Sequence, residues 1–160
     1  MDDRTRQRGN EPGITAETVA ANVKQLRTHR GLTQADLSER LTDIGRPIPV
    51  ASIGKLETGL RKIEVDDLVV LAIALDVSPL TLLLPGSRRA TDPVAATGVT
   101  TNAGRLWEWA LGVRSLEDGA SANEFASWSV PWWLHVDADV PTAQMHPVSR
   151  AKLEAEHADG

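Results

Sequence analysis

The chain of 160 residues contains no cysteine, no tyrosine and a single phenylalanine. Without cysteine it can form no disulfide, no thiolate metal site and no cysteine nucleophile. No stretch approaches the roughly 20 consecutive apolar residues of a membrane-spanning helix. The first residues, MDDRTRQRGNEPG, are polar and lack the apolar region of a secretory signal. These absences favour a cytoplasmic protein that does not associate with a membrane.

Motifs of catalysis and of cofactor or metal binding are also missing. There is no H-E-x-x-H metal motif, no Walker A motif and no Rossmann glycine pattern. The segment from Ser52 to Lys55 matches S-x-x-K, the nucleophile motif of some acyl-transferring enzymes, but no supporting motif accompanies it. Since a four-residue pattern arises often by chance, we expect no enzymatic activity, no metal and no cofactor.

The net charge of −5 is unevenly distributed. Residues 14–86 carry 8 Lys and Arg against 9 Asp and Glu, whereas residues 87–160 carry 6 against 10. A nearly neutral domain can bind nucleic acid if its positive charges share one face. Its non-specific affinity for DNA should be weak, because that affinity comes mostly from neutralising phosphates.

Residues 32–59, LTQADLSERLTDIGRPIPVASIGKLETG, have the pattern of two short helices joined across a bend. Thr33 is a suitable N-cap, and Asp36 stands where a capping carboxylate can reach back. Ile53 and Leu56 give the second helix an apolar face, and Gly59 is placed to end it. This arrangement predicts a helix-turn-helix, whose second helix can enter the major groove of DNA.

Apolar spacing and capping residues predict further helices on both sides. The helices before residue 76 are expected at about 15–30, 34–42, 50–58 and 65–75. A fifth begins after the Ser78-Pro79 cap, and another spans 102–114. The predicted organisation is a flexible arm (1–13), a helical domain (14–86), a linker (87–104), a Trp-rich segment (105–140) and a mobile tail (141–160).

GLTQADLSERL, SIGKLETG and LVVLAIALDVSPLTLL together resemble the Cro/C1-type (XRE-like) helix-turn-helix family over roughly residues 19–84. The resemblance implies an all-α, five-helix, lambda-repressor-like domain with a partly helical, Trp-rich C-terminal extension. It also implies a transcriptional regulator that binds double-stranded DNA as a homodimer. The GRPIP insertion and the tryptophans resemble those of a set of actinobacterial regulators.

By this resemblance, the helix at about 50–58 is the recognition helix. The positions that would read bases are Val50, Ala51, Ser52 and Lys55. The first two are apolar where many relatives have Gln, Arg or Asn, so they can contact thymine methyl groups but cannot form bidentate hydrogen bonds.

The resemblance also assigns supporting roles around this helix. Gln34, Arg61 and Lys62 match positions that contact phosphates, although each can equally be a solvated surface residue. Arg46 lies in an insertion, since Leu41 and Ile53 are 12 residues apart where the compact family pattern has about seven. It either contacts DNA or is an idle loop residue. Arg27 and Glu57 match a structural ion pair of the family.

All five tryptophans lie in the C-terminal part of the chain, at Trp107, Trp109, Trp128, Trp132 and Trp133. They can form a second small core, which burial tendencies favour. The alternatives are a dimer interface or a site for a small-molecule or protein effector. The second interpretation of the whole chain is therefore an interaction module, antitoxin-like for example, in which DNA binding is secondary.

Overall fold

The computed structural model describes residues 12–131 and residue 134. The chain divides into two compact units, residues 1–110 and 111–160. The predicted arm before residue 12, the predicted tail at 141–160 and the pair Trp132 and Trp133 lie outside the described residues.

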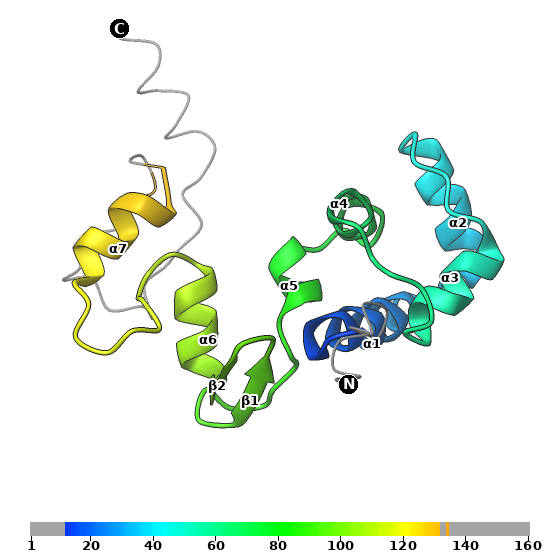
Figure 1. The fold of residues 1–160 in the computed structure, drawn as a ribbon. Coiled ribbons are helices and arrows are strands. Elements are labelled where there is room, and N and C mark those ends of the chain that lie inside the picture. Colours follow the sequence, from blue (N-terminus) through cyan, green and yellow to red (C-terminus); the bar gives the residue numbers. More distant parts are fainter. Residues whose placement is uncertain (1–11, 132–133, 135–160) are drawn as a thin grey trace, which may run out of the picture. The chain divides into compact units, whose positions relative to one another are not determined.

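Five helices form the first part of the chain (Figure 1). They are α1 (Ile14–His29), α2 (Gln34–Asp43), α3 (Val50–Glu57), α4 (Val65–Ala74) and α5 (Pro79–Leu83). The first four begin and end within one residue of the bounds predicted from the sequence. Helix α1 packs against α3 and α5, while α2 packs against α3 and α4.

Helices α1 to α4 end in the same way. The residue after each C-cap adopts a positive φ, and the next N–H bonds back to a carbonyl of the last turn, which is a Schellman motif. The residues with positive φ are Gly31, Gly45, Gly59 and Asp76. Each motif ends its helix sharply, and the next helix packs on the same core after a connection of four to seven residues.

A single aliphatic core joins these helices. Its most enclosed members have no exposed surface: Val23, Leu37, Leu41, Ile53, Leu56, Leu71, Leu75 and Leu82. Full burial of one such side chain stabilises a fold by about 1.5–3 kcal/mol. The apolar positions of the helix-turn-helix pattern are therefore the positions that hold α2 and α3 together.

The insertion between α2 and α3 is anchored to this core. Gly45 ends α2 with a φ of +88°, and Pro49 stands at the N-cap of α3. Between them, Ile48 is buried with 2% exposure, and its carbonyl accepts a hydrogen bond of 2.7 Å from Ser38 Oγ. The longer turn is thus a fixed part of the domain.

Residues 87–104, predicted to be a linker, contain an antiparallel β-hairpin. Strand β1 (Pro93–Ala96) pairs with β2 (Val99–Asn102) across a turn in which Gly98 has a φ of +84°. At the turn, the Thr97 N–H donates to Thr15 Oγ1 of α1 at 2.9 Å. The all-α prediction and the linker assignment are therefore both corrected by this hairpin, and the fold is mostly helical.

Helix α6 (Ala103–Ala110) follows the hairpin directly. It is shorter than the predicted helix over 102–114, and it begins after Asn102, whose Oδ1 accepts from the Arg105 N–H at 2.8 Å. Leu106 is buried at 1% exposure. Because α6 belongs to the first compact unit, that unit extends past the predicted boundary at residue 86.

The described part of the second unit contains α7 (Ala122–Ser129), which Ser121 caps through the Glu124 N–H at 3.3 Å. Gly112, with a φ of +75°, is required beside it, because a Cβ there would lie 2.5 Å from Val130 Cγ1. Over the described residues, no helix has the length and apolar character needed to cross a membrane. The same residues contain no group of three His, Cys, Asp or Glu side chains suited to a metal ion.

Candidate nucleic-acid interface

Helix α3 has one buried and one exposed face. Ile53, Leu56 and Glu57 are buried, whereas Ala51 and Lys55 are exposed. Positions 51 and 55 are four apart and therefore share one side of the helix. The residues predicted to read bases thus include this exposed pair.

An ion pair beneath α3 fixes its orientation. Arg27 of α1 donates two parallel hydrogen bonds to Glu57, from Nε to Oε1 at 2.5 Å and from Nη2 to Oε2 at 3.0 Å. Its Nη1 also donates to the Leu32 carbonyl at 2.6 Å. The side chains of Arg27 and Glu57 are 12% and 2% exposed. The structure therefore brings together the pair that the resemblance suggested, as a bidentate link between α1 and α3.

Gln34 extends this network from the first turn of α2. Its Nε2 donates to Glu57 Oε2 at 2.9 Å. Burial raises the pKa of Glu57, but the hydrogen bonds from Arg27 and Gln34 outweigh it, so the pKa lies below its ordinary value. Glu57 therefore remains a carboxylate at neutral pH and holds α1, α2 and α3 in register.

Gln34 also lies beside Gly54, a half-buried position of α3. A Cβ added at Gly54 would lie 3.4 Å from Gln34 Oε1, which is an ordinary contact distance. Neither a lack of space nor the backbone conformation therefore requires glycine at position 54. Val50 is 43% exposed and Ser52 is half-buried, so the first turn of α3 is partly open to solvent.

The start of α2 is capped in the way the sequence predicted. Thr33 Oγ1 accepts from the Asp36 N–H at 3.1 Å, and Asp36 Oδ2 accepts from the Thr33 N–H at 2.7 Å. The backbone hydrogen bond from Thr33 is the main reason that the pKa of Asp36 lies below its ordinary value. This capping box satisfies some of the N–H groups at the start of α2, while those of Gln34 and Ala35 have no partner within the helix.

Arg46 and Arg61 meet at one buried carboxylate, that of Asp67 in the first turn of α4. Asp67 is 1% exposed. Its Oδ1 accepts from Arg46 Nε and Nη2 at 3.2 and 3.1 Å, and its Oδ2 accepts from Arg61 Nη2 at 2.7 Å. The hydrogen bond to Asp67 is the main reason that the pKa of Arg46 lies above its ordinary value.

The two arginines of this cluster flank α3 in the sequence. Arg46 precedes the helix, in the insertion, and Arg61 follows it, in the turn toward α4. Arg46 also pairs with Glu64 at 3.1 Å and with Asp66 at 3.5 Å. Both arginines, predicted as DNA contacts, are thus engaged within the protein. Asp67 was not among the predicted site residues, because nothing local in the sequence links it to two arginines 21 and 6 residues away. Lys62, in the same turn as Arg61, is exposed.

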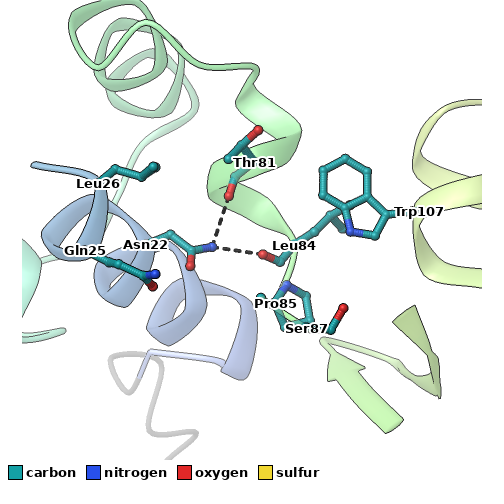
Figure 2. Close-up of a pocket in the computed structure, with 9 residues that line it drawn as sticks. Asn22, Gln25, Leu26, Thr81, Leu84, Pro85, Ser87 and Trp107 are labelled. Carbon is teal, nitrogen blue, oxygen red and sulfur yellow. Dashed lines mark hydrogen bonds between the residues drawn. The ribbon is translucent and has the colours of Figure 1, made fainter. Parts of the chain in front are cut away.

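A shallow pocket of about 240 Å³ lies beside Trp107 in the first unit (Figure 2). One wall is Asn22 of α1, whose Nδ2 donates to the carbonyls of Thr81, Leu82 and Leu84 at 3.1, 3.0 and 2.9 Å. Binding pockets for drug-sized molecules usually span about 300–1,000 Å³, so this one is small. These hydrogen bonds link α1 to the end of α5, so the Asn22 amide has a structural role.

The described tryptophans differ in their surroundings. Trp107 is half-buried at the pocket, Trp109 is 41% exposed, and Trp128 on α7 is 86% exposed. They therefore do not form one common core. A tryptophan as exposed as Trp128 is uncommon on a protein surface, because the ring is large and mostly apolar.

Comparison with known proteins assigns a class to this part of the chain. Residues 23–82 match a family model described as Helix-turn-helix. The match runs from the middle of α1 to α5 and includes α2 and α3, which confirms the predicted helix-turn-helix domain. Domains of this class bind DNA, and the match supports a DNA-binding regulator of transcription.

No curated protein matches the chain. Among solved structures, the chain is similar to the restriction-modification controller protein C.AhdI from Aeromonas hydrophila, with 27% sequence identity and a TM-score of 0.37. The similarity covers 42% of this chain and 94% of that one.

Proposed function

We propose that the helix-turn-helix domain binds double-stranded DNA sequence-specifically and regulates transcription, with α3 as the recognition helix in the major groove. The observation that carries this proposal is the two-faced character of α3. Its inner face is fixed by Ile53, Leu56 and the Arg27–Glu57 pair, while Ala51 and Lys55 stand uncovered on the outer face. A rigidly held helix with an open outer face is the arrangement that groove reading requires.

In this proposal, Lys55 makes the principal polar contact, to a guanine edge or to a phosphate. Val50 and Ala51 contact thymine methyl groups, and Ser52 donates or accepts a hydrogen bond. The small side chains on this face would allow the helix backbone to approach the bases closely. Specificity would then depend on a few contacts and on the shape of the site.

Phosphate contacts would flank the recognition helix. Gln34 stands at the N-terminus of α2, where backbone N–H groups and the helix dipole favour an anion. Lys62 lies just beyond α3. For Arg46 and Arg61 we propose a positioning role first, since Asp67 already binds both guanidinium groups. Through Asp67 they would set the ends of α3 relative to α4.

We further propose that the chain acts as a homodimer on two half-sites about one helical turn apart. Such a regulator would work in the cytoplasm, where it has access to the chromosome. The domain is nearly neutral, so affinity for random DNA should be weak and discrimination should come from the half-sites. In this proposal Ser52 and Lys55 serve DNA recognition, and the chain is not an enzyme and needs no cofactor.

A titration by fluorescence anisotropy tests the proposal. Labelled DNA from upstream of the protein's own gene is compared with random DNA at about 150 mM salt. Lys55→Ala should weaken specific binding by roughly 5- to 150-fold, the cost of about 1–3 kcal/mol for one base contact. If Lys55 contacts a phosphate instead, the slope of log K against log salt should fall by about one.

The matched control is Arg88→Ala, which removes the same charge from an exposed position in the loop after α5. It should leave both the affinity and the salt slope unchanged. Equal binding of upstream and random DNA by the folded protein would contradict the proposed function. An unchanged affinity and slope for Lys55→Ala would contradict its assigned role.

A second candidate function rests on Trp128. Its 86% exposure on α7 favours a contact with another protein, since exposed tryptophan is enriched at binding hot spots. The described part of the second unit would then bind an effector protein, and DNA binding would be secondary. Trp128→Ala tests this candidate: loss of partner capture with intact DNA binding would support it.

A further inference from the structure

Three carboxylates contact the guanidinium group of Arg46, and two of them lie at the surface. Its Nη2 is 3.1 Å from Glu64 Oε2, and its Nη1 is 3.5 Å from Asp66 Oδ2. The side chains of Glu64 and Asp66 are 72% and 77% exposed, whereas that of Asp67 is 1% exposed. Arg46 thus has one buried partner and two partners that an anion from solvent can replace.

The buried and the exposed carboxylates use different edges of this guanidinium group. Asp67 Oδ1 accepts from Nε and Nη2, which form the side edge, at 3.2 and 3.1 Å. The end edge, formed by Nη1 and Nη2, contacts Asp66 and Glu64. A phosphate binds an arginine through two parallel N–H groups of one edge. A phosphate can therefore take the end edge while Asp67 keeps the guanidinium group in place.

Arg46 lies close in the chain to the part of α3 that would enter the major groove. It precedes Val50, the first residue of α3, by four residues, which span at most about 14 Å. The first turn of a recognition helix contacts the base edges, and the major groove is about 12 Å wide. The insertion that carries Arg46 is fixed by the buried Ile48. Phosphates at the border of the groove are therefore within reach of Arg46.

The basic side chains on both sides of α3 are balanced by acidic ones. The insertion before α3, the turn after it and the first turn of α4 together carry three basic and three acidic residues. They are Arg46, Arg61, Lys62, Glu64, Asp66 and Asp67. Their net charge is zero. Since sequence-independent affinity for DNA comes from neutralising phosphates, these segments should add little to it.

We propose that Glu64 and Asp66 compete with DNA phosphates for the end edge of Arg46, and that this competition weakens binding to DNA of arbitrary sequence. Exposed ion pairs contribute little to stability, so a phosphate can displace both carboxylates. Part of its attraction to Arg46 is lost in doing so. The competition rests on the proposed function, because it requires α3 in the major groove.

Removing the two exposed carboxylates tests the competition. The variant Glu64→Gln/Asp66→Asn keeps the size of both side chains and removes both charges. Arg46 then gains one phosphate contact, which makes the slope of log K against log salt steeper by about 0.9. Relative to 1 M salt, this corresponds to a roughly fivefold higher affinity for random DNA at about 150 mM. Fluorescence anisotropy with a labelled random duplex, from about 50 to 200 mM salt, measures both quantities.

A second background separates competition at Arg46 from a general change in charge. Arg46→Gln removes the guanidinium group and leaves an amide that can still donate to Asp67. In this background, Glu64→Gln/Asp66→Asn should change neither the affinity for random DNA nor its salt slope. The gain is then assigned to Arg46 by a double-mutant cycle.

The matched control is Glu17→Gln/Glu124→Gln. Both residues are exposed and lie in the first turn of a helix, α1 and α7, as Asp66 does in α4. The control removes the same net charge and similar interactions with helix dipoles. Because salt at about 150 mM screens charges beyond about 8 Å, it should leave the affinity and the slope unchanged.

Three results would overturn the competition. They are an unchanged affinity and slope in Glu64→Gln/Asp66→Asn, an equal gain in the Arg46→Gln background, and an equal gain in the control. Circular dichroism checks that each variant is folded, and the first and third comparisons decide even if Arg46→Gln does not fold. The preference of the unaltered chain for upstream over random DNA tests the proposed function separately, so the two can fail independently.

Discussion

Replacement of Asp67 by alanine should reveal how strongly the two ends of α3 are held. The carboxylate is 1% exposed and accepts hydrogen bonds from Arg46 and Arg61 at 2.7–3.2 Å. Removing one partner of a fully buried ion pair costs about 3–5 kcal/mol. Here the side chains of the two arginines are 38% and 30% exposed and can regain water, which lowers the cost. We expect Asp67→Ala to lower the free energy of unfolding by about 2–3 kcal/mol.

Urea denaturation followed by circular dichroism measures this loss. A thermal scan should show a fall in Tm of roughly 10–20 °C, since 1 kcal/mol shifts a small domain by about 4–8 °C. The control is Asp66→Ala, the preceding residue on the same first turn. Asp66 has a side chain 77% exposed and pairs with Arg46 at 3.5 Å.

Both variants remove one acidic residue from the N-terminus of α4, so the loss of favourable interaction with the helix dipole is similar in each. Asp66→Ala should therefore cost less than about 1 kcal/mol, as exposed pairs do. Equal losses for the two variants would show that the buried position of Asp67 makes no difference to stability.

Three further predictions concern single residues. Gly54→Ala should stabilise the domain by about 0.5–1 kcal/mol in urea denaturation, because glycine is a poor helix former and the added Cβ meets Gln34 only at contact distance. Gly45→Ala should destabilise it by about 1–2 kcal/mol, because alanine disfavours the φ of +88°, whereas Gly86→Ala, with no such φ, should change little. Glu57→Gln should lower stability at neutral pH, and this deficit should shrink in acid. The pKa of Glu57 lies below its unfolded value of about 4.3, so its contribution is present above that value and is lost as the pH falls through the folded pKa.

Each of these has a result that would count against it. A destabilised Gly54→Ala variant would show that Gln34 cannot yield to the added methyl group. Equal stabilities for the Gly45 and Gly86 variants would show that the positive φ at Gly45 does not affect stability. If the stability deficit of Glu57→Gln stays constant from neutral pH to pH 3, folding does not lower the pKa of Glu57.

The local features of the fold could be read from the sequence because the residues that cause them are adjacent. The Thr33–Asp36 capping box, the Ser78-Pro79 start of α5 and the glycine stop at Gly59 each depend on neighbours within four residues. The spacing of apolar residues then predicted which face of each helix points into the core, because buried positions recur with the period of the helix.

The hairpin and the buried position of Ile48 escaped prediction for a different reason. Strands β1 and β2 are four residues each, too short for a clear alternating pattern, and the turn at Thr97 is held by Thr15, which is far away in the sequence. Ile48 lies between two prolines in a segment that otherwise has the composition of an exposed loop. Its burial depends on the space that α2 and α3 leave in the core.

The candidate site was predictable where the family pattern fixes a role and not where charges meet across the fold. Arg27 and Glu57 were assigned together because both positions belong to the pattern. Arg61 was assigned to a phosphate because it matches a family position just past the recognition helix, whereas Arg46, in the insertion, was left open between a DNA contact and an idle loop residue. The competing partner, Asp67, becomes visible only when the first turn of α4 is folded against the insertion.

Selection of binding sites from a random-sequence duplex library by the purified full chain tests whether α3 reads DNA. We expect enrichment of one short half-site motif that recurs as an inverted repeat spaced by about one helical turn, and loss of the enrichment with Lys55→Ala. If the folded protein enriches no motif over the starting library, α3 does not read DNA.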